Sequence, residues 1–140
     1  MLELKYVNPS NLHDAWELIQ DGLEVCIKQD DEHPLKEDVY TAIRMGNSHL
    51  HLGYESGKYV GFIILTPFNA PYTGLMTLHV WFAYKDGGMH LTPEGQREIE
   101  KIARHMNASR ITFRTPKAAF ERLAPNLGYE ISQVQWVKYL

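Results

Sequence analysis

The sequence predicts an α/β (α+β) fold in which helices pack on one mixed sheet. Apolar residues recur at helical spacing in some stretches and at alternate positions in others, and the two kinds of stretch are interleaved along the chain. Their order is strand, helix, helix, hairpin, strand, helix, strand, helix, strand, which in a compact chain favours a single sheet covered by helices. With 140 residues and 44% hydrophobic content, the chain fits one domain over residues 1–140.

The first third of the chain predicts a strand and two helices. Residues 1–7 alternate apolar and charged side chains, as a half-buried strand does. A helix follows, and its apolar face consists of Leu12, Ala15, Trp16, Ile19, Leu23 and Ile27. The charged run before Pro34 ends that pattern, and a second helix over residues 35–45 stops at Gly46.

The middle of the chain predicts a hairpin and then a loop. Two runs with strand character, residues 49–54 and 59–66, flank a short turn that contains Gly57. Residues 60–65 are almost all apolar, so their strand is expected at the centre of the sheet, covered on both faces. A loop is expected over residues 67–74, long enough to border a site.

The second half predicts an anion-binding arrangement. A strand over residues 75–84 leads through a glycine turn at residues 86–88 into a helix over residues 93–106. A strand over residues 110–114, a short helix that ends at residues 127–129 and a last strand over residues 131–140 follow. The free N–H groups of such a turn and the dipole of the helix that follows favour an anion such as a pyrophosphate.

Composition excludes several classes of protein. The formal net charge of -3 supplies no global basic field, so we expect no nucleic-acid partner. No stretch approaches the roughly 20 apolar residues of a membrane helix, and the amino-terminal residues lack the pattern of a signal peptide. The single cysteine, Cys26, excludes an internal disulfide framework and is expected as a small buried apolar group. A cytoplasmic protein with no membrane contact is the expectation.

Three local motifs accompany the element order. Tyr59-Val60-Gly61-Phe62-Ile63 places a glycine in an apolar strand, residues 118–123 followed by Leu127-Gly128-Tyr129-Glu130 form a late helix and its closing motif, and Lys85 to His90 form a glycine turn. In the order of its predicted helices and strands and in these motifs, the chain resembles the GNAT superfamily of N-acetyltransferases, which use acetyl-CoA as co-substrate. The resemblance covers nearly the whole chain and implies a central, mixed, mainly antiparallel sheet with helices on both faces. It implies cofactor binding by Val80, Phe82, Lys85, Gly87, Gly88, His90 and Arg97.

The chain departs from the resembled family at two places. In the turn, His90 replaces a small residue, and Glu94 puts a carboxylate in the first turn of the helix that follows. In the late helix, Ala124 stands where many family members have the tyrosine that protonates the departing thiolate. Tyr84 or Tyr129 could replace that acid, and Tyr84 is the candidate catalytic residue.

His79 is the candidate general base. It lies on the strand that leads to the glycine turn, and histidine has a pKa suited to removing a proton from an amine near neutral pH. A half-buried strand histidine with a local hydrogen bond is the alternative. His49 and His51 share one strand face, but no acidic residue or cysteine at ligand spacing accompanies them, so no metal site is predicted.

Other residues leave two interpretations each. The acidic run at residues 30–32 could attract a cationic amine or be a solvated loop. Aromatic residues could wall an acceptor pocket or fill the core: Phe68, Tyr72, Trp81, Phe82 and Tyr84. Trp136 and Tyr139 on the last strand could serve an edge or a homodimer contact.

Two functional hypotheses follow. The first is an intracellular or phage-encoded acyl-CoA-dependent N-acetyltransferase that transfers an acetyl group directly to a small-molecule or peptide amine, with no Ser or Cys nucleophile. The second is a protein of the same fold that has lost catalysis and serves as a binding or structural module, as the altered turn and Ala124 suggest.

Overall fold

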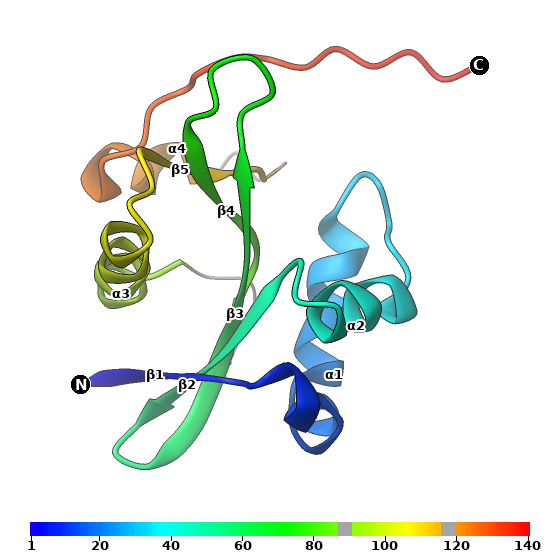
Figure 1. Ribbon diagram of the computed structural model, residues 1–140, viewed down its shortest axis with the longest axis vertical. Helices are drawn as coiled ribbons and strands as arrows, with labels where there is room; N and C mark the ends of the chain where they lie inside the picture. Colours follow the sequence, from blue (N-terminus) through cyan, green and yellow to red (C-terminus); the bar gives the residue numbers. More distant parts are fainter. Residues whose placement is uncertain (87–90, 116–119) are drawn as a thin grey trace.

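A five-stranded sheet with helices on both faces forms the protein (Figure 1). The computed structural model describes residues 1–86, 91–115 and 120–140. The elements in chain order are β1 (Leu2–Tyr6), η1 (Pro9–Asn11), α1 (Leu12–Gln29), α2 (Lys36–Arg44), β2 (His49–Glu55), β3 (Lys58–Asn69), β4 (Met76–Lys85), α3 (Pro93–His105), β5 (Arg110–Phe113), α4 (Phe120–Leu123) and η2 (Pro125–Leu127).

The strands lie in the sheet in the order in which they occur in the chain, from β1 to β5. The first three neighbouring pairs are antiparallel and β4 pairs with β5 in parallel, so the expected mixed, mainly antiparallel sheet is confirmed. The parallel pair follows from chain connectivity, because α3 carries the chain from the end of β4 back to the start of β5.

Two separate hydrophobic clusters lie on the two faces of the sheet. The cluster under α1 and α2 includes Leu12, Ile19, Leu23, Cys26, Val39, Ile43, Leu50, Leu52, Phe62, Ile64 and Phe82. The cluster under α3 includes Ile63, Leu65, Leu78, Val80, Ala83, Leu91, Ile99 and Ala103. Because side chains alternate along β3, this central strand supplies both clusters, as its continuous apolar run predicts.

The predicted loop after β3 is shorter than expected, because β3 continues through Pro67 to Asn69. Proline is tolerated there because β2 pairs with β3 only as far as Leu65, so that beyond Leu65 β3 has a strand neighbour on one side only. The missing N–H of Pro67 therefore removes no ladder hydrogen bond. The connection that remains spans residues 70–75, and Tyr72 at its tip is fully exposed.

The prediction of a last strand over residues 131–140 is wrong. Residues 130–140 form no strand and are exposed throughout, and in Figure 1 the carboxyl-terminal segment runs away from the helices and the sheet. Alternation of side chains makes a segment fit for a strand, but a strand also needs a neighbour for its N–H and C=O groups. No described part of the same chain pairs with this segment.

Gly22 of α1 allows the helix to approach β4 closely. A Cβ at this position would lie 2.5 Å from Cδ1 of the Tyr84 ring. Gly22→Ala is therefore expected to lower the free energy of unfolding by about 1–3 kcal/mol, although alanine improves an unhindered helix position by about 1 kcal/mol. Urea denaturation measures the difference.

Asp21→Ala is the matched control, because Asp21 is exposed on the same helix. It should change stability by no more than about 0.5 kcal/mol. A Gly22→Ala variant as stable as the wild type would contradict the close packing of Tyr84 on α1.

His51 of β2 makes the fold sensitive to acid. Burial and the neighbouring His49 lower the pKa of His51 from 6.5 to about 4. Between these two values the unfolded chain binds a proton that the folded chain does not, so stability is lost as the pH falls. The shift predicts a loss of about 2 kcal/mol between pH 7.5 and pH 5, measured by urea denaturation at both pH values.

His51→Gln is expected to remove that part of the pH dependence. His13→Gln, at an exposed position of α1, is the control and should retain the wild-type loss. Equal slopes in all three proteins would show that His51 is not the group responsible.

Candidate functional site

The candidate site lies where β4 and β5 part. The two strands pair only over Thr77–Val80 and Arg110–Phe113. β4 continues to Lys85, still paired with β3 on its other side, while no described strand lies against its free edge beyond Val80. The backbone groups on this edge beyond Val80 thus have no strand partner among the described residues, although the carbonyl of Ala83 accepts a hydrogen bond of 3.9 Å from Cys26 Sγ. We call this edge of β4 the opening.

A β-bulge in β4 marks the same point. Ile64 pairs with Phe82 and the next residue, Leu65, pairs with Val80, so Trp81 is the extra residue. Trp81 and Phe82 both pack against the cluster under α1, and their rings stack with centroids 5.0 Å apart. Val80 lies on the opposite face, in the cluster under α3. Val80 and Phe82, two predicted cofactor residues, thus flank the bulge on opposite faces of the sheet.

The amino terminus of α3 follows the opening in the chain. Thr92 caps the helix, since its hydroxyl accepts a hydrogen bond of 3.1 Å from the Gly95 N–H. The carboxylate of Glu94 accepts a hydrogen bond of 3.2 Å from the N–H of Leu2. It is thus held toward β1, at the far edge of the sheet from β5. Three predicted cofactor residues, Gly87, Gly88 and His90, lie outside the described residues.

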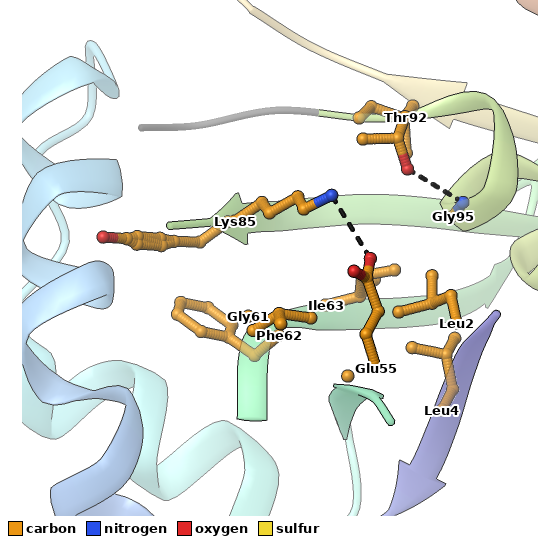
Figure 2. A pocket seen from close by; sticks show the side chains of 13 residues that line it. Leu2, Leu4, Glu55, Gly61, Phe62, Ile63, Lys85, Thr92 and Gly95 are labelled. Carbon is orange, nitrogen blue, oxygen red and sulfur yellow. Dashed lines mark hydrogen bonds and ion pairs between the residues drawn. The ribbon is translucent and has the colours of Figure 1, made fainter. Parts of the chain in front are cut away.

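Lys85 points away from the opening and toward the β2–β3 turn. Figure 2 shows its ammonium directed at Glu55, with Nζ 3.3 Å from the carboxylate. The two side chains border a cavity of about 40 Å³, which has room for a few water molecules at most. Both are more than a third exposed, so the ion pair is weak and exchangeable. Arg97, another predicted cofactor residue, is exposed on α3.

His79 lies just before the bulge and bonds across to β5. Its Nδ1 lies 2.8 Å from Oγ1 of Thr112, its partner in the parallel register. Burial lowers the pKa of His79, the guanidinium of Arg114 lowers it further, and Asp30 opposes them. The imidazole is therefore held neutral near neutral pH, as a proton acceptor must be. The contact with Thr112 agrees equally with the alternative interpretation, in which His79 is a half-buried strand histidine with a local hydrogen bond.

The loop between α1 and α2 reaches the end of β5. Arg114 lies 3.4 Å from the carboxylate of Glu32 and 3.9 Å from that of Asp31. The acidic run that the sequence singles out is thus tied to the β5 side of the opening. All three side chains are half exposed or more, so the loop is held loosely.

The candidate acids occupy different places. Tyr84 packs against Gly22 of α1 and lies 5.7 Å, ring to ring, from Phe62. Tyr129 donates a hydrogen bond of 2.8 Å to the side-chain oxygen of Gln96, and its burial raises the pKa of the phenol to about 12. Tyr129 therefore lies against α3, whereas Tyr84 lies against α1, so the structure does not bring the two candidates together.

Gln96 is a residue that sequence reasoning missed. It is buried on the apolar face of α3, and its amide also donates to Glu100 at 3.1 Å. A polar residue in register with Ile99 and Ala103 was the available signal. Ala124 contributes only backbone here, since its carbonyl accepts from the N–H groups of Leu127 and Tyr129. The tyrosine position of the resembled family thus serves a turn in this chain.

Two kinds of site are not found in the described part of the chain. It holds no group of three or more His, Cys, Asp or Glu side chains that could bind a metal ion. None of its helices is long and apolar enough to cross a membrane.

Solved structures share this architecture over its whole length. Ribosomal-protein-alanine N-acetyltransferase from Brucella melitensis biovar Abortus 2308 matches with a TM-score of 0.71 at 14% identity, covering 100% of this chain and 99% of that one. An aminoglycoside acetyltransferase from an uncultured soil metagenomic sample, solved with sisomicin, gives 0.70 at 13% identity over 99% and 96%. Glucosamine-6-phosphate N-acetyltransferase from Arabidopsis thaliana gives 0.61 at 12% identity over 99% and 98%.

Comparisons by sequence give nothing further. No protein-family model matches the chain, and no curated protein matches it. The short pairing of β4 with β5, the bulge in β4 opposite β3 and the similarity to the solved acetyltransferases agree with one another: this chain has the fold of the GNAT superfamily.

Proposed function

We propose that this protein is an N-acetyltransferase that transfers an acetyl group from acetyl-CoA directly to an amine. The observation that carries the proposal is the edge of β4 that no described strand covers beyond Val80, next to a bulge and before the amino terminus of α3 in the chain. A folded chain leaves a stretch of strand backbone unpaired only at a cost. A ligand that bears amide groups, as coenzyme A does, offers that edge the partners it lacks.

The chain's own groups suit the two ends of such a ligand. The backbone between Val80 and Lys85 would hold the amide-bearing arm, and the amino terminus of α3, with the glycine turn that the sequence predicts at residues 86–88, would hold the pyrophosphate. Lys85 would add a cation after leaving Glu55, which its exposed ion pair permits. Glu94 keeps its negative charge, but its carboxylate is turned toward β1, where it accepts a hydrogen bond from the Leu2 N–H.

His79 would act as the base. In the neutral tautomer that donates its Nδ1–H to Thr112 Oγ1, the imidazole would keep its Nε2 available to accept a proton from the acceptor amine. The amine nitrogen forms the new C–N bond at the thioester carbonyl carbon, the C–S bond breaks, and the sulfur takes up a proton. Tyr84 stays the candidate acid for that proton, while water is the alternative donor where no side chain is placed.

The acceptor is expected to be a cationic small molecule or peptide. The carboxylates of Asp31 and Glu32 lie beside the opening, and Arg114 engages both only loosely. The similar structures are named for different amine acceptors, an alanine of a ribosomal protein, an aminoglycoside and a sugar phosphate. That range supports an amine and leaves the acceptor class open.

A binding module of the same fold is the second candidate. It is favoured by two observations, the backbone role of Ala124 and the engagement of Lys85 by Glu55. Such a protein would hold coenzyme A or a different ligand at the opening without turnover. Cytoplasmic residence stays a prediction for either candidate, in keeping with the single buried thiol, Cys26.

Ligand binding tests the proposal directly. Isothermal titration of the purified chain with acetyl-CoA and with coenzyme A is expected to give micromolar dissociation constants. Lys85→Ala should weaken both about tenfold, because a charge-assisted contact to phosphate is lost. Glu55→Ala is the matched control: it frees the Lys85 ammonium and should leave binding unchanged or tighter.

The outcomes distinguish whether the protein binds coenzyme A, whether Lys85 contributes to binding and whether the bound ligand reacts. No heat with either ligand would retire the acetyltransferase proposal. Dissociation constants that are the same in the wild type and in both variants would support the proposal but show that Lys85 does not contact the ligand. Binding without turnover on a broad panel of amines would favour the second candidate.

The pH dependence of turnover tests His79. Because its pKa is lowered, the rate should rise with pH through a value below 6.5 and be level near neutrality. His79→Gln should lower kcat by about 10²–10⁴-fold and abolish that rise. Release of the coenzyme A thiol with an active amine measures both.

His105→Gln is the control, since His105 is exposed at the last turn of α3. It should keep the wild-type rate and pH profile. A His79→Gln variant that also keeps the wild-type profile would assign His79 a structural role only.

A further inference from the structure

The outer edge of β1 is open. β1 is the first strand in the sheet order and pairs with β2 only, so no described strand lies on its other side (Figure 1). Val7, just after β1, donates a backbone hydrogen bond of 2.9 Å to the carbonyl of Leu50. In an antiparallel ladder every second residue bonds to the same neighbour. The N–H and C=O groups of Leu2, Leu4 and Tyr6 therefore point away from β2, toward the open edge.

The hydrogen bond of Leu2 agrees with this direction. Its N–H donates to the carboxylate of Glu94 at 3.2 Å instead of to β2. For the N–H groups of Leu4 and Tyr6, no described strand lies on that side to accept them. Unpaired groups of this kind form a template for a further strand. The backbone of β1 is thus able to receive one.

The side chains of β1 form two different rows. Leu4 packs against the cluster under α3, and Leu2 and Tyr6 share its face because side chains alternate along a strand. Glu3 and Lys5 lie on the other face, toward the cluster under α1 and α2. Both charged side chains are exposed, and Tyr6 is 53% exposed. The edge therefore carries an apolar row on one face and one charge of each sign on the other.

This pattern is complementary to itself in one antiparallel register. When two copies of β1 pair with Leu4 opposite Leu4, Glu3 of each copy lies opposite Lys5 of the other, and Leu2 lies opposite Tyr6. A pairing centred on Glu3 or on Lys5 would place like charges opposite each other, which is destabilising. A register shifted by one residue would bring apolar side chains onto the charged face.

The charges of β1 therefore favour a second copy. Charged side chains usually protect an edge strand from an incoming strand. Here Glu3 and Lys5 of two copies would meet as non-hydrogen-bonded pairs, in which side chains approach each other most closely. The ammonium of Lys5 already lies on this face, 4.8 Å from the centre of the Tyr54 ring. Opposite charges at such cross-strand positions are stabilising.

We infer that two copies of this chain pair through β1, with Leu4 opposite Leu4, so that their two five-stranded sheets join into one continuous sheet. The Leu4 N–H of each copy donates to the Leu4 carbonyl of the other, and the Tyr6 N–H donates to the Leu2 carbonyl. The contact has twofold symmetry and closes on itself. A strand of five residues covers less than a standard interface of about 1,600 Å², so the dimer is expected to dissociate in the micromolar range.

Analytical ultracentrifugation over a range of concentrations tests this inference by charge reversal. Glu3→Lys and Lys5→Glu should each weaken the dimer about tenfold, because the symmetric contact contains the pair twice and both pairs become repulsive. The double variant exchanges the two charges and should restore the wild-type dissociation constant to within about threefold. Glu17→Lys, at an exposed position of α1, is the matched control and should leave the dimer unchanged.

A proline substitution tests the backbone contact. Tyr6→Pro should weaken the dimer about tenfold more than Tyr6→Ala, because both variants lose the ring but only proline lacks the N–H that the second copy binds. The lost N–H points away from β2, so proline leaves the β1–β2 ladder intact. Urea denaturation of each variant verifies that it folds.

A disulfide identifies the register. Cα atoms of a non-hydrogen-bonded pair lie about 4.5 Å apart, within the range that a disulfide spans. A mixture of Glu3→Cys and Lys5→Cys should therefore give a disulfide-linked dimer on oxidation, whereas either variant alone should not, since Cys26 is buried. Four results would overturn the inference: a wild type that is monomeric at millimolar concentration, a dimer that either charge reversal leaves unchanged, a double variant as weak as the single ones, or no disulfide specific to the mixture.

Discussion

The antiparallel ladder between β3 and β4 is the interaction on which the rest of the fold depends. It runs from Gly61 and Lys85 at one end to Asn69 and Met76 at the other. Its residues supply the centre of both hydrophobic clusters, so each helical layer is attached to the other through these two strands. The approach is so close that a Cβ at Gly61 would overlap the carbonyl oxygen of Tyr84. Glycine is required there by space rather than by backbone conformation.

One irregularity in that ladder creates the candidate site. The bulge at Trp81 changes which side chains of β4 face α1, and it lies just where pairing with β5 ends. A bulge increases local twist, which carries the rest of β4 away from the direction of β5. The backbone groups of β4 on this edge make no hydrogen bonds to a neighbouring strand, which costs free energy. The same groups are left accessible to a ligand. The candidate site therefore depends on the backbone of β4 more than on any single side chain. This agrees with a chain that departs from the resembled family at His90 and Ala124.

Sequence patterns predicted the parts of the structure that local periodicity determines. The helical face around Leu23, the helix after Thr92, the hairpin at Gly57 and the central position of residues 60–65 follow from spacing and turn residues alone. Patterns could not predict what depends on neighbours in space. Pro67 lies in a strand because β2 ends beside it, and the predicted last strand is unpaired because no edge of its own chain receives it.

The same limit applies to the candidate site. The sequence identified His79 and the acidic loop as candidates by residue type, but their meeting through Thr112 and Arg114 depends on the parallel register of β5. Charge alone suggested that Lys85 favours and Glu94 opposes a phosphate. The structure gives each a protein partner, Glu55 and the Leu2 N–H, that no spacing rule foretells.

β5 links the candidate site to the open edge of the sheet. Thr112 of this short strand lies within hydrogen-bond distance of Nδ1 of His79, and Arg114, which follows the strand, adds its charge to the burial that lowers the pKa of His79. The other side of β5 is an edge of the sheet that no described strand covers. A strand of four residues paired on one side only is weakly held. Whatever fixes the position of β5 also fixes the hydrogen bond that orients the imidazole. Order in β5 and order at the site are therefore expected to be coupled, since a ligand that binds the ordered form of β5 increases its population.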